Sequence, residues 1–390
     1  MAVGQVGGLL PHVAVPSTMP AFLIPEWGLS YGEAGLMASA YAIGYMLAAP
    51  ILTTLTDRLD GRRILILGSL LNAAGAIGFG LWADGMVSAM LLWALTGMGF
   101  AGSYMPGLKA LSDRLDPGES SRSFTFYTSA FSFGVGLSFL ACQLVAEAWG
   151  WRAAFVLTGL APLAMTFVAW TLRPVTPAPR AGPVLDLVPA LRNRAALGYS
   201  FAYGCHCFEL YGLRTWLVAF WGFVAARGDM PLGAVVVSAV ITIIAMPASI
   251  LGNELALKLG RHRAVTLVML LSAVVALAIG FTAGLSPWLT LALMLLYAFT
   301  TPGDSGALTS GMAAAADPRF RGASMAVHST VGFGLTAAGG WVVGVALDMA
   351  GGVSQPGAWA LAYTVMAAAV ALGPVCLWWS RRGTASRWTT

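Results

Sequence analysis

Charged side chains are scarce in this sequence, where Asp, Glu, Lys and Arg together make up 9% of the 390 residues. Soluble domains carry about 25% charged residues, so a surface that faces water on all sides is excluded for a chain of this length. Hydrophobic residues make up 58% of the chain, and its mean hydropathy is +0.78. The composition therefore indicates a protein whose outer surface faces lipid.

Cysteine is also rare, and Cys142, Cys205, Cys207 and Cys376 all lie in apolar runs. None forms a spaced pair in a polar loop, so no disulfide framework is expected. The tripeptide Cys205-His206-Cys207 does not predict a metal site, because helix residues two apart point about 160° away from each other. We expect no metal and no other cofactor.

Apolar runs of membrane-spanning length recur along the whole chain. A spanning helix needs about 20 apolar residues, and the first run has no basic residue ahead of it, so no cleavable signal peptide is expected. Twelve spans are predicted, at residues 3–24, 34–55, 64–83, 87–108, 124–146, 153–172, 196–223, 232–253, 265–284, 287–311, 324–346 and 357–379. The predicted fold is an all-α polytopic membrane protein with two pseudo-symmetric bundles of six helices.

The one long polar connection, from Arg173 to Arg194, contains five prolines and separates the two predicted bundles. We predict an N-terminal bundle at 1–172, and a cytoplasmic linker at 173–194 with a short amphipathic helix near 184–192. The C-terminal bundle and a short tail follow at 195–390.

Basic residues are distributed very unequally between the two predicted sides of the membrane. Of the 21 Lys and Arg residues, 18 fall in the tail or in the loops after even-numbered spans. Two, Arg152 and Arg227, fall on the opposite side, and Arg214 lies inside a span. The positive-inside rule then places both termini in the cytoplasm of a bacterial-type inner membrane. It also explains the net charge of +5 without any nucleic-acid partner.

An internal repeat supports two related halves. The segment from Leu55 to Arg63 matches the segment from Leu255 to Arg263, and Ser129 with Phe133-Gly134 matches Ser329 with Phe333-Gly334. Pro106-Gly107 in the fourth span corresponds to Pro302-Gly303 in the tenth. Parallel repeats with Gly and Pro interruptions at corresponding positions are typical of secondary transporters.

The loop from Thr53 to Arg63 resembles the cytoplasmic signature of the major facilitator superfamily, Gly-x-Leu-x-Asp-Arg-x-Gly-Arg-Arg, with Thr53 and Asp60 standing where the signature has glycine. A degenerate copy runs from Leu257 to Arg263. The resemblance extends to helix count, loop lengths and topology. It implies gating contacts between helix ends in one conformation that are released in another. The residues expected in this role are Asp57, Arg58, Arg62, Arg63, Lys258, Arg261 and Arg263.

The resemblance implies a monomeric transporter, not an enzyme, that moves a small solute across the lipid bilayer by alternating access, with protons as the simplest energy source. Two features depart from common subfamilies. Trp93 stands where many proton-coupled members carry arginine, and the stretch 132–136 lacks the proline of drug–proton antiporters. No subfamily is therefore assigned.

An ionisable side chain inside a membrane span raises the free energy of membrane insertion, so the few that occur are usually functional. The resemblance implies that the first, fourth, seventh and tenth spans line the cavity, and His12, His206, Glu209, Arg214 and Asp304 fall on that set, whereas His328 lies in the eleventh. The predicted substrate-binding residues are Arg214, His206, Glu209, Asp304, Tyr203, Tyr211, Trp216, His12, Tyr104 and Ser305. The predicted proton-coupling residues are Glu209, Asp304, His206 and His328.

Each of these residues also has a structural interpretation. Arg214 either binds a substrate anion or neutralises Glu209 or Asp304, and the two carboxyls either carry a proton or serve as permanent ion-pair partners. His206 either relays a proton or hydrogen-bonds to Glu209. His12 and His328 can simply bridge two helices.

A small organic anion is the first expectation for the substrate, because of Arg214. The alternatives are an exporter of amphipathic or cationic compounds, and a non-transporting membrane sensor or assembly factor. An intramembrane enzyme is not favoured, because the sequence shows no convincing set of a nucleophile with its base or of metal ligands. Gly97–Gly102 and Gly303–Gly306 resemble nucleotide-binding and protease motifs but lack the fold around them that those motifs need.

Overall fold

In a computed structural model of the protein, the described residues are 1–56, 58–115, 120–177 and 187–381, and they contain helices but no strands. Contacts divide the chain into two units. The first unit is Met1–Gly28 with Ala40–Leu185, and the second is Leu29–Ser39 with Asp186–Thr390. The helix α4 belongs to both units, because its first residues group with the second unit and the remainder with the first.

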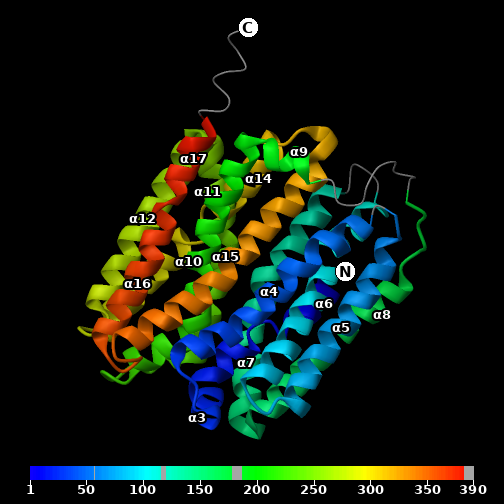
Figure 1. The fold of residues 1–390 in the computed structure, drawn as a ribbon. Coiled ribbons are helices and arrows are strands. Elements are labelled where there is room, and N and C mark those ends of the chain that lie inside the picture. Colours follow the sequence, from blue (N-terminus) through cyan, green and yellow to red (C-terminus); the bar gives the residue numbers. More distant parts are fainter. Residues whose placement is uncertain (57, 116–119, 178–186, 382–390) are drawn as a thin grey trace. The chain divides into compact units, whose positions relative to one another are not determined.

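The first unit begins with a broken helix and continues with long ones, coloured blue to green in Figure 1. Its elements are α1 (Ala2–Leu9), α2 (Ala14–Thr18), the π-helix η1 (Met19–Leu23), α3 (Ile24–Trp27), most of α4 (Tyr31–Leu55), α5 (Gly61–Trp82), α6 (Met86–Ser112), α7 (Ser120–Leu160) and α8 (Leu163–Thr171).

The break between α1 and α2 lies at residues 10–13, where the sequence places Pro11. One side chain of α7 satisfies the backbone groups that the break leaves open. The Ser138 hydroxyl donates to the Leu10 carbonyl at 2.7 Å and accepts from the Val13 N–H at 3.2 Å. In a membrane, non-helical backbone is tolerated where neighbouring helices satisfy it in this way.

The helix α7 covers two of the predicted spans, because the chain bends at Gly150 without an intervening loop. Gly150 has φ 84°, a left-handed conformation that glycine adopts without steric cost. Directly after it, Arg152 donates to the carbonyls of Gly80 and Ala83 at the end of α5. A cation at a helix C-terminus is favourable because of the helix dipole.

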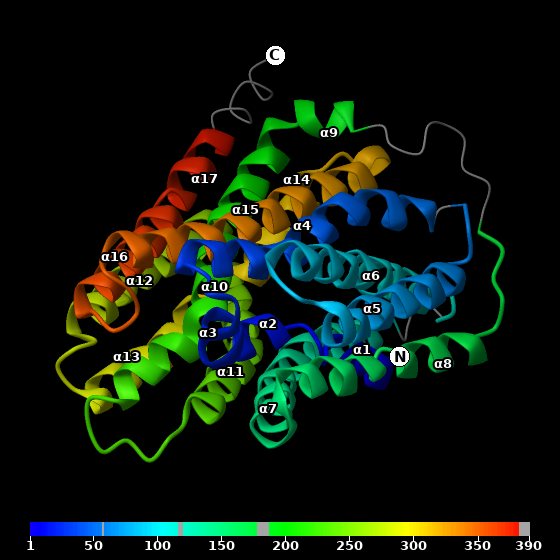
Figure 2. The same ribbon diagram turned by 60° about the horizontal axis from the view of Figure 1, so that its bottom comes forward.

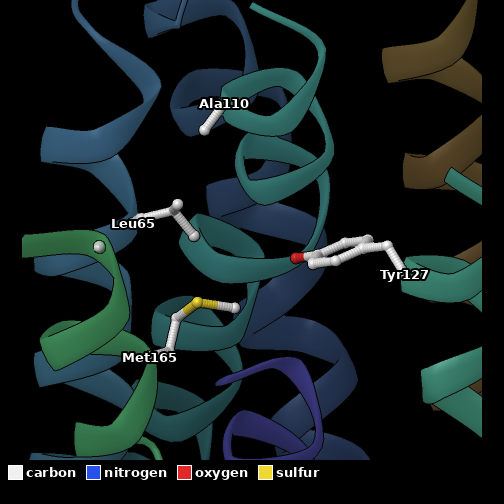
Figure 3. Packing of buried hydrophobic residues seen from close by; sticks show 5 residues of the cluster. Leu65, Ala110, Tyr127 and Met165 are labelled. Atoms are coloured by element: carbon white, nitrogen blue, oxygen red, sulfur yellow. The ribbon is translucent and has the colours of Figure 1, made fainter. Parts of the chain in front are cut away.

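Small residues let the helices of the first unit pack closely. A Cβ atom added at Gly68 in α5 would lie 2.6 Å from the Gly102 backbone in α6, which is the small-residue packing typical of membrane helices. Figure 3 shows the buried cluster of Leu65, Ala110, Tyr127 and Met165, to which Ala169 also belongs. The Tyr127 hydroxyl donates to the Gln5 side chain at 2.8 Å.

The second unit is built around α10, which packs most extensively on α15; the two run side by side in Figure 1. In Figures 1 and 2, α12 and α16 also lie next to each other, and α17 continues the direction of α16. The elements of this unit are α9 (Val188–Arg192), α10 (Arg194–Ala225), α11 (Ala234–Leu259), α12 (Arg261–Thr282), α13 (Pro287–Thr300), α14 (Ser305–Ala315), the 3-10 helix η2 (Pro318–Phe320), α15 (Arg321–Met349), α16 (Pro356–Ala371) and α17 (Gly373–Arg381).

The start of α4 is held against the end of α15 within the second unit. The Asp348 carboxylate accepts from the backbone N–H groups of Tyr31 at 2.9 Å and Gly32 at 2.6 Å. Two turns further along α4, the Ser39 hydroxyl donates to the Ala337 carbonyl at 2.6 Å. A carboxylate at a helix N-terminus satisfies free N–H groups and interacts favourably with the helix dipole.

Helices occupy all twelve predicted spans, so the all-α fold expected from the sequence is confirmed. The tenth span is two helices, α13 and α14, separated at Pro302-Gly303, and the first is the broken run from α1 to α3. Within the described residues, eight helices are long and apolar enough to cross a membrane, or nine if the bent run at the N-terminus counts as one span.

Candidate functional site

Three ionisable side chains of α10 are buried inside the second unit. His206 is 1% exposed, Glu209 is fully buried and Arg214 is 5% exposed. Each lies against a different set of helices, since α10 packs on α11, α13, α14, α15 and α16. Burial of polar groups is costly unless they find partners, so the partners of these three residues define the site.

His206 pairs with Asp304 at the break of the tenth span. Its Nδ1 atom lies 2.7 Å from Asp304 Oδ1, and both side chains are 1% exposed. The break exists because Pro302 lacks an N–H and Gly303 is flexible, and Asp304 occupies the residue before α14. The sequence suggested Glu209 as a hydrogen-bond partner of His206, but the structure places Asp304 against the imidazole instead.

The break is also pressed closely against α11. A Cβ atom at Gly252 would collide with the carbonyl oxygen of Gly303, so only glycine allows this approach of the two backbones. The close contact thus holds Gly303, the residue between Pro302 and Asp304, against α11.

Glu209 is held by two hydroxyls that the sequence analysis did not identify. The Ser272 hydroxyl of α12 donates to Glu209 Oε1 at 2.8 Å, and the Tyr297 hydroxyl of α13 donates to the same oxygen at 2.9 Å. Glu209 Oε2 has no hydrogen-bond partner within the described residues. Ser272 and Tyr297 lie in apolar runs with no motif around them, so no sequence signal pointed to either.

Arg214 forms no ion pair with any residue that the structure describes. Its guanidinium carbon lies 5.3 Å from the centroid of the Tyr211 ring, a cation–π contact. The sequence left open whether Arg214 neutralises Glu209 or Asp304. In the structure Glu209 accepts from Ser272 and Tyr297 instead, and Asp304 contacts His206.

Arg214 lines a cavity with about 270 Å³ of space not filled by atoms. The cavity lies between α10, α11 and the broken tenth span, and most of its wall is aliphatic. Its lining residues are Leu210, Leu213, Arg214, Leu217, Ile241, Thr242, Ala245, Ala298, Thr301 and Pro302. Ligand sites are typically apolar cavities with a few polar groups that orient the ligand, and this cavity has that composition.

A second polar group surrounds His328 on α15. Its Nδ1 atom lies 3.3 Å from the Ser200 hydroxyl, and its Nε2 atom lies 3.4 Å from the Thr309 hydroxyl. The Tyr203 ring stacks on His328 at 4.1 Å between centroids and on His206 at 5.6 Å. Tyr203 thereby connects the two histidines, and His328 bridges α15 with α10 and α14.

Of the predicted binding residues in the second unit, Arg214 alone belongs to the cavity lining, and Trp216 and Ser305 are among those outside it. The Trp216 indole N–H donates to the Gly340 carbonyl of α15 at 2.9 Å, and the side chain is 2% exposed. Ser305 is the first residue of α14, directly after Asp304. Their binding role stays a prediction.

His12 and Tyr104 lie in the first unit, within one aromatic group. The His12 ring lies 4.8 Å from Tyr41, 5.6 Å from Phe100 and 5.7 Å from Phe131. Tyr104 lies 5.3 Å from Phe131, again between ring centroids. The break between α1 and α2 thus presents His12 to rings from α4, α6 and α7.

Among the predicted gating residues, Asp57 lies outside the described residues. Arg58 and Arg63 are exposed, and Arg62 donates to the Leu172 carbonyl at 3.1 Å. In the degenerate copy, Lys258 and Arg263 are exposed and Arg261 is half-buried. The gating role of these residues stays a prediction.

Asp60, which departs from the family signature, organises this loop in the structure. Its carboxylate accepts from the Arg62 N–H at 3.0 Å as the cap of α5, from Arg114 at 2.7 Å and from the Val175 N–H at 2.9 Å. Burial alone would raise the pKa of Asp60, but the hydrogen bonds from Arg114 and two backbone N–H groups hold that pKa below its ordinary value.

The fold and the buried polar cluster define a polytopic transporter. Residues 2–340 match the profile of the Major Facilitator Superfamily, and the chain belongs to this family. It is therefore a membrane transporter and not an enzyme.

Several known proteins are similar to the chain. The gallate transporter of Pseudomonas putida is 31% identical over 201 residues, which are 49% of this chain and 42% of that protein. The 4-hydroxybenzoate transporter PcaK of the same species is 27% identical over 232 residues, which are 52% of this chain and 50% of that protein. The chain thus matches about half the length of these relatives.

A solved structure supports the fold over the whole chain. The bacterial homologue of the human lysosomal transporter Spinster, in its inward-facing and occupied conformation, superposes with a TM-score of 0.77. The superposition covers 100% of this chain and 97% of that one, at 17% sequence identity. At this identity the likeness concerns the fold alone.

Proposed function

We propose that the protein transports a small organic anion, a compact monocarboxylate, and binds it at Arg214. The observation that carries this proposal is a buried guanidinium that lines a cavity and forms no ion pair within the described residues. Guanidinium is always charged and matches a carboxylate with two parallel hydrogen bonds. A buried cation without an anionic partner is costly, and a substrate carboxylate would supply that partner.

The cavity wall supports the same substrate class. Aliphatic side chains such as Leu213, Leu217 and Ile241 would contact the apolar body of the ligand. Two similar proteins are named for gallate and 4-hydroxybenzoate, which are aromatic carboxylates with one ring.

Proton coupling is the second part of the proposal. Glu209 and the Asp304–His206 pair are buried in the same unit as Arg214. Buried carboxyl and imidazole groups can gain and lose a proton as their surroundings change. We propose that Glu209, Asp304 and His206 carry the coupling proton and that His328, which Tyr203 connects to His206, belongs to the same network.

Alternating access is the third part, in a monomer with both termini in the cytoplasm of the inner membrane. The later part of α4 is fixed to α6, because Gly44 lies against Ala94 and Gly97 lies against the Tyr41 carbonyl. The first part of α4 is held on α15 through Asp348 and Ser39. Movement of one predicted helix bundle against the other therefore requires the start of α4 to leave α15.

Export of amphipathic cations has less support. That function needs an acidic side chain at the substrate cavity, whereas neither Asp304 nor Glu209 belongs to the lining of the Arg214 cavity. No observation favours a non-transporting sensor or assembly factor over transport.

The first test is transport by the Arg214→Gln variant in proteoliposomes. We expect uptake of aromatic monocarboxylates to fall about a hundredfold, because loss of one partner of a buried charge pair costs about 2–5 kcal/mol. Arg214→Lys keeps the charge but loses the planar fork, and it should retain partial activity. The matched control is Arg227→Gln, whose guanidinium lies over the Phe223 ring and donates to Ser354 outside the cavity lining. Normal carboxylate uptake by Arg214→Gln would refute the proposal.

A further inference from the structure

Thr242 has an unmet hydrogen-bonding capacity beside Arg214. Its side chain is 2% exposed and lines the cavity, and its hydroxyl has no hydrogen-bond partner within the described residues. Buried hydroxyls are normally paired. Thr301, the other threonine of the lining, lies 3.3 Å from the Ser272 hydroxyl, so Thr242 alone among the lining threonines has an unused hydroxyl.

Several threonines elsewhere in the helices of this protein behave differently, although the buried hydroxyls of Thr166 and Thr336 also lack a partner within the described residues. A threonine inside a helix commonly donates to the carbonyl four residues earlier. This bond is present, at 2.6–2.9 Å, in Thr54, Thr96, Thr158 and Thr330. Thr242 lies inside α11 and does not form it, so its hydroxyl remains available to a group in the cavity.

The remaining lining restricts what that group can be. The ten lining residues include one cation, two hydroxyls and no carboxylate. A ligand with its carboxylate on Arg214 and an apolar body against the aliphatic wall needs a second polar group to satisfy Thr242. A hydroxyl can donate to or accept from the threonine hydroxyl, and it adds little volume in a cavity of about 270 Å³.

We infer that Thr242 is a specificity-determining residue of the Arg214 cavity, selecting compact monocarboxylates that carry a hydroxyl over the same carboxylates without one. This inference rests on the proposed function, because it requires the carboxylate to bind at Arg214. A site built to hydrogen-bond a substrate hydroxyl rejects the analogue that lacks it, since its own polar group is then left unpaired.

The test compares the affinity of the purified protein for benzoate with its affinities for 2-, 3- and 4-hydroxybenzoate by titration calorimetry in detergent. In the wild type we expect at least one hydroxybenzoate to bind about tenfold more tightly than benzoate. Thr242→Val keeps the shape of the side chain and removes the hydroxyl, so it should abolish this preference. Thr242→Ser restores the hydroxyl and should recover it.

Two further variants distinguish a failure of the inference on Thr242 from a failure of the proposed carboxylate site at Arg214. Ser238→Ala removes another buried hydroxyl without a partner, one turn before Thr242 on α11 but outside the cavity lining, and it should leave the preference unchanged. If Arg214→Gln abolishes binding of all carboxylates but Thr242→Val keeps the wild-type preference, the inference is wrong and the proposed function stands. If Arg214→Gln binds all of them normally, both are wrong. If Thr242→Val does not fold, Thr242→Ala replaces it, with the same expected loss of preference.

Discussion

At the scale of single residues, the three ionisable side chains buried on α10 have different neighbours. His206 contacts Asp304 beside α14, Glu209 accepts from α12 and α13, and Arg214 faces the cavity. His206 and Glu209, which are neighbours on α10, therefore do not pair with each other. The three-residue spacing of His206 and Glu209 made their contact plausible, but pairing across helices satisfies more buried groups.

The His206–Asp304 contact makes a prediction for stability. Asp304→Ala leaves the imidazole buried without its partner, and removal of one member of a buried pair costs about 3–5 kcal/mol. We expect a correspondingly large fall in the free energy of unfolding, measured by denaturant titration in detergent. The exposed Arg319–Asp317 pair is the control, and Asp317→Asn should cost less than about 1 kcal/mol.

A double-mutant cycle shows whether the two residues act together. His206→Ala with Asp304→Ala should cost less than the sum of the single variants, because neither buried group is then left alone. Strictly additive losses would show that the 2.7 Å contact contributes nothing to stability.

At the scale of helices, the irregular elements are stabilised by side chains from other helices. Ser138 satisfies the broken first span, and Gly252 admits the backbone of the broken tenth span. The start of α4 is capped by Asp348 of α15, and the start of α5 by Asp60. Prolines in the sequence indicated both helix breaks. They did not indicate which residues would hydrogen-bond to the backbone at a break or pack against it.

The cap of α5 gives a pH-dependent prediction. Because the pKa of Asp60 is lowered in the folded protein, its stabilising contribution is complete above the ordinary Asp value of about 3.9. It is lost as the pH falls through the lower folded-state pKa. Asp60→Asn should therefore lower stability at pH 7 by about 1 kcal/mol, since asparagine caps the helix but cannot pair with Arg114.

Thermal unfolding of wild type and variant between pH 3 and pH 7 tests this sign. The difference between them should shrink toward low pH, where Asp60 of the wild type is also neutral. Arg114→Gln should show the same loss at pH 7, and the double variant should lose little more. A difference that grows toward low pH would contradict this role of the Asp60–Arg114 pair.

At the scale of the whole molecule, α4 is the element that belongs to both units. A Cβ atom at Gly32 would lie 3.7 Å from the Val345 Cα atom and 3.2 Å from one of its methyl groups. This spacing suits a disulfide. In the double variant Gly32→Cys/Val345→Cys, oxidation should cross-link α4 to α15 and stop transport, because the start of α4 could no longer leave α15.

Uptake in proteoliposomes before and after oxidation measures this effect, and a reductant should restore transport. Each single-cysteine variant, treated with the same oxidant, is the control for modification without cross-linking. Undiminished transport by the fully cross-linked protein would exclude separation of α4 from α15 as a step of the cycle.

The sequence by itself determined the class of the protein. The sequence has few charged residues and twelve apolar runs of spanning length. It therefore predicts a bundle of spanning helices, because backbone polar groups inside lipid must pair within their own segment. The loop from Thr53 to Arg63 indicated the family, and the cost of burying charge singled out His206, Glu209, Arg214 and Asp304. These features depend on composition and local periodicity, which a sequence displays directly.

Only the tertiary structure decided which buried groups contact one another and which face empty space. Ser272, Tyr297 and Thr242 look like ordinary polar residues of apolar helices, and their roles depend on what other helices place beside them. Asp60 stands where the family signature has glycine, yet at the start of α5 its carboxylate accepts hydrogen bonds from Arg114 and from the Val175 N–H. Contacts between residues far apart in sequence depend on how the helices pack, and helix periodicity contains no information about that packing.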